Sequence, residues 1–95
     1  MENKYCIIRG NNSGVFAGEL ANLEGTKAEI VNCRRLWYWD GACSLSELAQ
    51  KGTSKPDKCK FTMEVDKVYI LDTIEILECS QEAKENIKGV QVWKF

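Results

Sequence analysis

Hydrophobic and polar positions alternate along most of this chain in short runs, a pattern typical of β-strands rather than of long amphipathic helices. In residues 4–9 (KYCIIR), Tyr5 and Ile7 fall on one face of the predicted strand, and Cys6 and Ile8 fall on the other. Similar runs, separated by turn residues, predict further strands over residues 15–21, 27–39, 61–70, 73–79 and 90–95.

Several of these strands are predicted to be irregular. Gly18 indicates a bulge or a close approach of another segment within residues 15–21. A change of phase at Asp66 and Lys67 predicts a bulge or a break between two strands. In residues 73–79, Ile74 and Ile76 are expected to point inward.

Two short helices are predicted from capping signals. Ser44 and Glu47 form a capping box that opens a helix over residues 44–51, which ends at Gly52. Ser80 caps a second helix to about residue 86, and Gly89 lies beyond its end. The pattern therefore predicts an α+β fold: a small, mainly antiparallel β-sheet or partly open barrel of six or seven strands, with two short helices.

Length and composition indicate one domain over residues 1–95, with 44% hydrophobic and 28% charged residues. A chain this short buries a modest core, so we expect it to form a homo-oligomer. There is no apolar run of membrane-spanning length and no signal-peptide pattern, which predicts a cytoplasmic protein with no membrane partner. Five scattered cysteines without a CxxC pair indicate reduced thiols.

The sequence contains no histidine. This removes the usual general base and every nucleophile that is activated by histidine. It also removes the commonest zinc ligand. We therefore predict no catalytic residues, no metal and no cofactor.

The formal net charge of −1 argues against a binder of duplex nucleic acid. The charge is uneven, however, because residues 33–60 hold six basic and three acidic side chains, a local charge of +3. A basic centre within a nearly neutral chain is better suited to a small anion than to a long polyanion.

Residues 33–48 (CRRLWYWDGACSLSEL) contain the densest recognition chemistry. Arg34 and Arg35 can hold phosphate or carboxylate oxygens with planar guanidinium groups. Trp37, Tyr38 and Trp39 offer flat faces on which a base can stack. The same aromatic run is also typical of a buried strand, and both interpretations stay open. Tyr38 and the arginines are the better candidates for ligand binding, and Trp37 and Trp39 are the better candidates for the core or an interface.

Regular alternation would place Arg35 among apolar side chains, where an unpaired charge is costly. We therefore expect a bulge near Arg34 and Arg35 that turns both side chains toward solvent or a ligand. Lys58 or Lys60 is expected as a closing cation, near a loop over residues 53–59 that could act as a flap. Arg9 and Ser44 are weaker candidates for ligand binding.

Four segments, SGVFAGEL, RRLWYWDGACSLSELA, PDKCKF and GVQVWKF, resemble a family of small proteins found in phage and prophage genomes and known chiefly as a domain of unknown function. Phages also encode small oligomeric sponge proteins that sequester the cyclic nucleotide signals of host defence. The resemblance indicates a phage or prophage origin. Cyclic oligonucleotides are small, anionic and contain bases, so the arginines and aromatics of this chain predict such a role in the host cytoplasm, with a cyclic oligonucleotide as the ligand. One alternative is capture of a host protein by a patch that joins the aromatic strand to the last strand, with Val92, Trp93 and Phe95. The other is binding of single-stranded nucleic acid.

Overall fold

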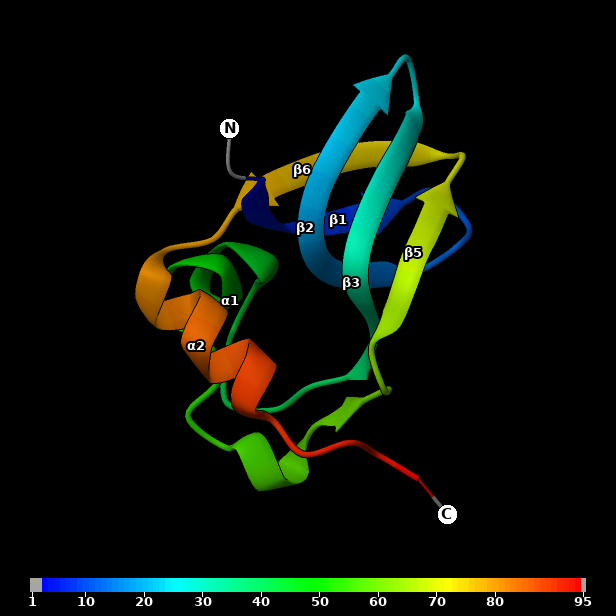
Figure 1. Ribbon diagram of the computed structural model, residues 1–95. Helices are drawn as coiled ribbons and strands as arrows, with labels where there is room; N and C mark the ends of the chain where they lie inside the picture. The colour runs from blue at the N-terminus through cyan, green and yellow to red at the C-terminus, as the bar shows by residue number, and fades with distance from the viewer. Residues whose placement is uncertain (1–2, 95) are drawn as a thin grey trace.

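An open, mostly antiparallel sheet of six strands forms the centre of the structure, and two short helices pack against it (Figure 1). The computed structural model describes residues 3–94. The elements follow in the order β1 (Lys4–Gly10), β2 (Val15–Glu24), β3 (Lys27–Tyr38), α1 (Leu45–Lys51), a 3₁₀ turn (Pro56–Lys58), β4 (Lys60–Phe61), β5 (Val65–Ile70), β6 (Thr73–Glu78) and α2 (Gln81–Gly89). The predicted α+β fold class is confirmed.

The long strand β3 connects the two parts of the sheet. The strands lie in the order β4-β3-β2-β1-β6, and β5 also pairs with β3. Residues 28–33 of β3 pair with β5, whereas Leu36 and Tyr38 near its end pair with β4. Of the described helices, none is long and apolar enough to cross a membrane.

Strand alternation divides the buried side chains between two cores. Tyr5 and Ile7 of β1 pack toward the helices, in a helix-side core that also holds Leu48 and Ile87. The alternate residues of β1 point to the opposite face, where they belong to a sheet-side core of Cys6, Ile8, Phe16, Ala28, Ile30, Cys33 and Ile70. This alternation in β1 agrees with the sequence prediction.

Strand β3 contains a bulge just before its two arginines, Arg34 and Arg35. Ala17 pairs with Arg34 and Glu19 pairs with Val31, so two residues of β3, Asn32 and Cys33, lie opposite Gly18 alone. Asn32 has a φ of 49°, a left-handed conformation that asparagine tolerates better than most residues. A Cβ atom on Gly18 would lie 2.6 Å from the Ile30 side chain, so the close approach predicted at this glycine is confirmed.

After the bulge, Arg34 points into the protein and not toward solvent. Its side chain is buried, with 3% of its surface exposed. The guanidinium donates hydrogen bonds to four backbone carbonyls, those of Phe61, Thr62, Ile87 and Val90, at 2.9–3.2 Å. Burial lowers the pKa of the Arg34 guanidinium, but arginine remains charged. The prediction that the bulge exposes both arginines is therefore wrong for Arg34.

The helix signals predicted the two helices well. The Ser44 hydroxyl accepts a hydrogen bond from the backbone N–H of Glu47, and Gly52 ends α1 with a φ of 76°. The Ser80 hydroxyl accepts one from the backbone N–H of Ala83 and so opens α2, which extends to Gly89.

Three predictions about the strands are wrong. Strand β5 runs unbroken through Asp66 and Lys67, and the break lies earlier, between Phe61 and Val65. The inward placement of Ile74 is wrong, since this side chain is 53% exposed, whereas Ile76 packs against the sheet-side core as predicted. Residues 90–94 form no strand and make only a single parallel bridge, between Val92 and Phe61. The last predicted residue, Phe95, lies outside the described residues.

We predict that Arg34→Ala lowers the free energy of unfolding by about 3 kcal/mol or more, because it leaves buried carbonyls without hydrogen-bond donors. Each such carbonyl costs roughly 1–3 kcal/mol, and water that enters the site offsets part of this cost. Arg34→Lys should fall between the wild type and Arg34→Ala, since an ammonium cannot reach all of these carbonyls. Urea denaturation measures the effect. Arg35→Ala is the control, with an expected loss below about 1 kcal/mol, and equal losses for the two alanine variants would contradict the assignment.

Buried thiols predict a loss of stability in alkaline solution. Burial raises the pKa of Cys6 from 9.0 to about 11 and the pKa of Cys33 from 9.0 to about 12. The folded chain therefore keeps these protons when the unfolded chain loses them, and the free energy of unfolding should fall as the pH rises from about 9 toward 12. Urea midpoints at pH 8 and pH 10.5 test this. Cys33→Ala should reduce the difference between the two midpoints. An unchanged difference would show that the Cys33 thiol does not cause the loss of stability.

Candidate functional site

One open pocket brings together three of the residues singled out in the sequence, Arg35, Trp37 and Trp39. Its volume is about 320 Å³. We call it the Arg35 pocket, and it lies between the β1–β2 loop and the end of β3, lined by Asn12, Ser13, Gly14, Val15, Arg35, Leu36, Trp37 and Trp39.

A second irregularity in β3 places the indole of Trp37 at this pocket. Leu36 pairs with Phe61 and Tyr38 pairs with Lys60, so Trp37 has no partner residue on β4. Its side chain is 62% exposed. Trp39 is half-buried and packs against the helix-side core. Of the two tryptophans considered as core or interface residues, Trp39 thus contributes to the core, whereas Trp37 lies on the surface.

Arg35 is an exposed cation that no carboxylate neutralises within residues 3–94. Its Nη1 atom donates a hydrogen bond of 2.8 Å to the carbonyl of Ser13. Its guanidinium carbon lies 4.5 Å from the centre of the Phe16 ring, which supports the planar group from one side. Packing and one hydrogen bond thus fix the position of the charge without cancelling it.

Asp72, from the turn after β5, orders the loop that forms the other wall of the pocket. Its carboxylate accepts hydrogen bonds from the Ser13 hydroxyl at 2.6 Å and from the backbone N–H groups of Asn12 and Ser13 at 2.7 and 3.1 Å. These bonds lower the pKa of the Asp72 carboxyl, and the bond from the Ser13 hydroxyl has the largest effect. Asp72 therefore acts on Arg35 through Ser13, the residue whose carbonyl the guanidinium contacts.

The other expected ligand residues lie away from this pocket. Tyr38 is 50% exposed, and the Lys60 ammonium lies over its ring at 5.9 Å and over the Trp93 ring at 5.5 Å. Arg9 forms an ion pair with Glu75 at 3.1 Å. Ser44 caps α1, and Lys58 is an exposed residue of the 3₁₀ turn.

The loop considered as a flap is tied to the turn that follows β3. The backbone N–H of Ser54 donates to the Gly41 carbonyl at 3.2 Å, and the Thr53 hydroxyl donates to the Asp40 carbonyl. The loop therefore packs beside Asp40 and Gly41, and none of its residues lines the Arg35 pocket.

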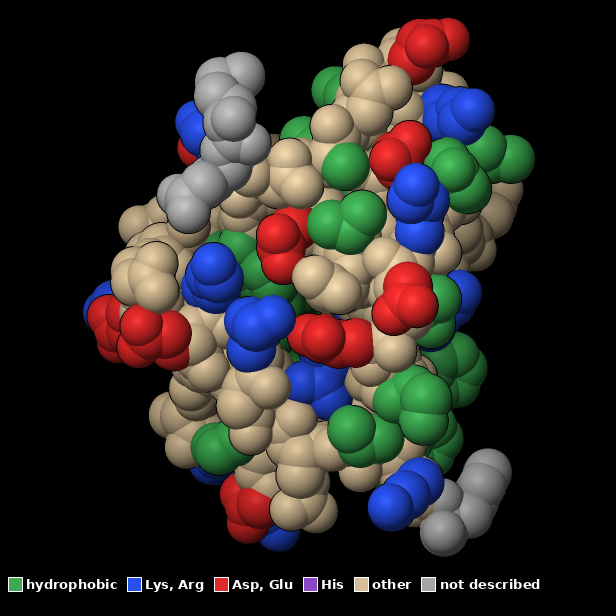
Figure 2. Space-filling view, in the orientation of Figure 1, with side chains coloured by type: hydrophobic (Ala, Val, Ile, Leu, Met, Phe, Trp, Pro, Cys, Tyr) green, Lys and Arg blue, Asp and Glu red, His purple; other side chains and the backbone are tan. Residues whose placement is uncertain are grey.

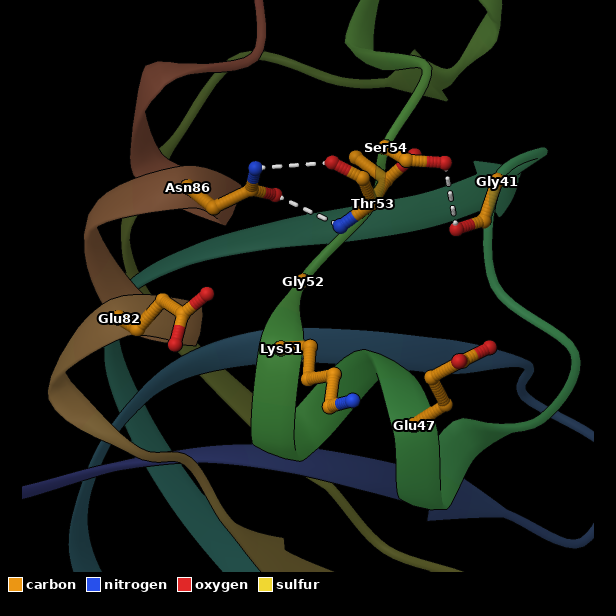
Figure 3. Close-up of a pocket in the computed structure, with 8 residues that line it drawn as sticks. All are labelled: Gly41, Glu47, Lys51, Gly52, Thr53, Ser54, Glu82 and Asn86. Carbon is orange, nitrogen blue, oxygen red and sulfur yellow. Dashed lines mark hydrogen bonds between the residues drawn. The ribbon is translucent and has the colours of Figure 1, made fainter.

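A larger pocket, of about 360 Å³, lies between the two helices (Figure 3). The side chains of Glu47, Lys51 and Glu82 border its opening, and the Asn86 amide is bonded to both backbone groups of Thr53. Opposite charges share this pocket, no aromatic side chain lines it, and none of the expected ligand residues reaches it. The Arg35 pocket is therefore the better candidate site.

Sequence reasoning missed the contribution of Asn12, Ser13 and Asp72. The run GNNSG predicts a turn, which is correct, but nothing local in the sequence connects it to a carboxylate 59 residues further on. Among residues 3–94, no group of three or more side chains of the metal-binding types is placed to hold an ion.

Residues 3–87 match the model of a family described as Domain of unknown function (DUF6948), and the chain belongs to this family. No curated protein matches the sequence. No solved structure matches it either.

We predict that Asp72→Ala loosens the loop at Asn12 and Ser13, because two backbone N–H groups and one hydroxyl lose their acceptor. Backbone order parameters from NMR relaxation should fall for these two residues and stay unchanged for β3. The carboxyl has a lowered pKa, so its contribution is present at neutral pH and is lost only as the pH falls below the usual range of an aspartate. Unchanged order in the variant would show that Asp72 does not hold the loop.

Proposed function

We propose that this chain is a non-catalytic binding protein for a small anionic ligand with an aromatic base, held in the Arg35 pocket. The observation that carries the proposal is the presence of one unneutralised guanidinium and two indoles in a single pocket. Arginine favours phosphate oxygens, and indole faces favour bases, so a nucleotide fits both.

The contacts of Arg35 leave donors for such a ligand. Within the described residues, the only hydrogen bond of its side chain comes from Nη1, so Nε and Nη2 have no protein acceptor there. Hydrogen bonds between a guanidinium and a phosphate are charge-assisted and are stronger than those between neutral groups. The stacking of Arg35 on Phe16 and its bond to Ser13 reduce the entropy that binding must overcome.

The size of the pocket favours one nucleotide unit. Its volume of about 320 Å³ is near the lower end of the usual range for ligand sites. A cyclic oligonucleotide would insert one base and its phosphate, and the rest of the ring would lie outside the pocket.

These features support a phage-encoded sponge that sequesters a cyclic oligonucleotide in the host cytoplasm and so protects the phage from host antiviral defence. Sequestration requires affinity and no chemical step, which suits a chain without histidine. The resemblance to phage and prophage proteins points in the same direction.

Native mass spectrometry with cyclic di-AMP, cyclic di-GMP, 3′,3′-cyclic GMP-AMP and cyclic tri-AMP tests the proposal. A nucleotide adduct in fixed ratio to the subunits supports it. No adduct with any of the four nucleotides would contradict it and favour capture of a host protein. Binding of oligothymidylate in their place would favour the single-stranded nucleic-acid alternative.

We predict that Arg35→Ala weakens binding of the nucleotide found in that screen by roughly 10- to 100-fold, the equivalent of about 1.5–3 kcal/mol for a charge-assisted hydrogen bond. Trp37→Ala should weaken binding by a similar factor, because stacking contributes about 1–3 kcal/mol per base. Isothermal titration calorimetry measures both changes, and salt should reduce the wild-type affinity.

Lys60→Ala is the matched control. It also removes one cation near aromatic rings, but Lys60 lies with Tyr38 and Trp93 outside the Arg35 pocket. We expect its affinity to equal that of the wild type. A large loss in Lys60→Ala combined with none in Arg35→Ala would place the site at Tyr38 instead.

A further inference from the structure

Strand β5 has one edge without a partner in the part of the chain that the structure describes. It pairs with β3 along residues 65–70, and no other strand of residues 3–94 pairs with it. A free edge presents a row of backbone donors and acceptors that another strand can pair with.

Exposed apolar side chains accompany this edge. Met63, Val65, Tyr69 and Leu71 are 65%, 50%, 51% and 67% exposed. Figure 2 shows hydrophobic side chains along the right-hand margin of the molecule, the side on which β5 lies in Figure 1. Proteins commonly protect edge strands with charged residues, and in β5 these are the neighbouring Asp66 and Lys67, so that its other four residues are uncharged. Lys67 is paired with Glu29 of β3, at 3.6 Å.

We propose that β5 is a self-association surface, on which a second copy of this chain adds its own β5 in antiparallel orientation. The two sheets then become one continuous sheet across a two-fold axis.

The order of residues in β5 favours one register. A two-fold axis between antiparallel strands places one residue opposite its own copy. With Val68 at the axis, Val65 lies opposite the second copy's Leu71, and Lys67 lies opposite its Tyr69. The apolar residues then cover each other, and the ammonium meets an aromatic ring.

The neighbouring registers are less favourable. An axis at Asp66 or at Lys67 places two like charges directly opposite each other, which destabilises the pair. An axis at Tyr69 places Val65 opposite the second copy's Thr73, a polar residue of β6, so Val65 loses its apolar partner. Charge and apolar pairing thus both select Val68.

Sedimentation equilibrium over a range of micromolar concentrations tests the association. We expect the wild type to form dimers, and Leu71→Lys to weaken the dimer at least tenfold, because it places a charge in an apolar pair. Ile74→Lys is the matched control, since Ile74 is similarly exposed, at 53%, but lies on β6. A monomeric wild type, or loss of the dimer in Ile74→Lys alone, would overturn the proposal.

A disulfide tests the register. In a Cys43→Ser background, which removes the exposed native thiol, Val68→Cys should form a cross-linked dimer on mild oxidation, because residues directly opposite bring their Cβ atoms close together. Lys67→Cys should cross-link much less, since it lies opposite Tyr69. Efficient cross-linking through residue 67 and not through residue 68 would rule out the Val68 register.

Discussion

The structure depends on one buried cation that binds backbone carbonyls from two segments distant in the sequence. Arg34 on β3 donates to Phe61 of β4, to Thr62 just after it, and to Ile87 and Val90 at the end of α2. The carbonyls at the end of a helix lack partners within the helix and carry partial negative charge. A guanidinium has five donors and no acceptor, so it can satisfy such a group of carbonyls with a single side chain.

The bulge in β3 explains how neighbouring arginines acquire opposite roles. Side chains alternate in any strand, so one of two adjacent residues must point inward. The extra residue opposite Gly18 shifts the phase of β3, which places Cys33 in the sheet-side core and directs Arg34 toward α2. Arg35 then emerges over Phe16 on the other face. A side chain on Gly18 would clash with Ile30, so the glycine permits this arrangement.

Local signals in the sequence predicted local structure. Ser44, Gly52 and Ser80 specify helix ends through their own backbone and side-chain bonds, so these ends could be found without a fold. Residues 90–94 have the composition of a strand, but alternation alone cannot tell whether a partner strand is available. Ile74 is exposed for the same kind of reason, because the position of β6 at the edge of the sheet decides which of its side chains have neighbours.

For similar reasons, the sequence identified only part of the candidate site. Residue types identified Arg35, Trp37 and Trp39. Which of Arg34 and Arg35 points inward depends on the bulge, and the role of Asp72 depends on the tertiary structure. Where contacts join residues distant in the sequence, composition and spacing do not determine which side chains meet.

The Arg35 pocket and β5 are also physically connected. Arg35 lines a second cavity, of about 110 Å³, together with Val65 and Val68 of β5. Asp72, two residues after β5, holds the loop that contacts Arg35 from the other side. A strand added to β5 would therefore restrain the cavity wall beside Arg35 and the turn that holds the loop at Ser13. Because linkage is reciprocal, any gain in ligand affinity from association must appear as an equal gain in association from the ligand.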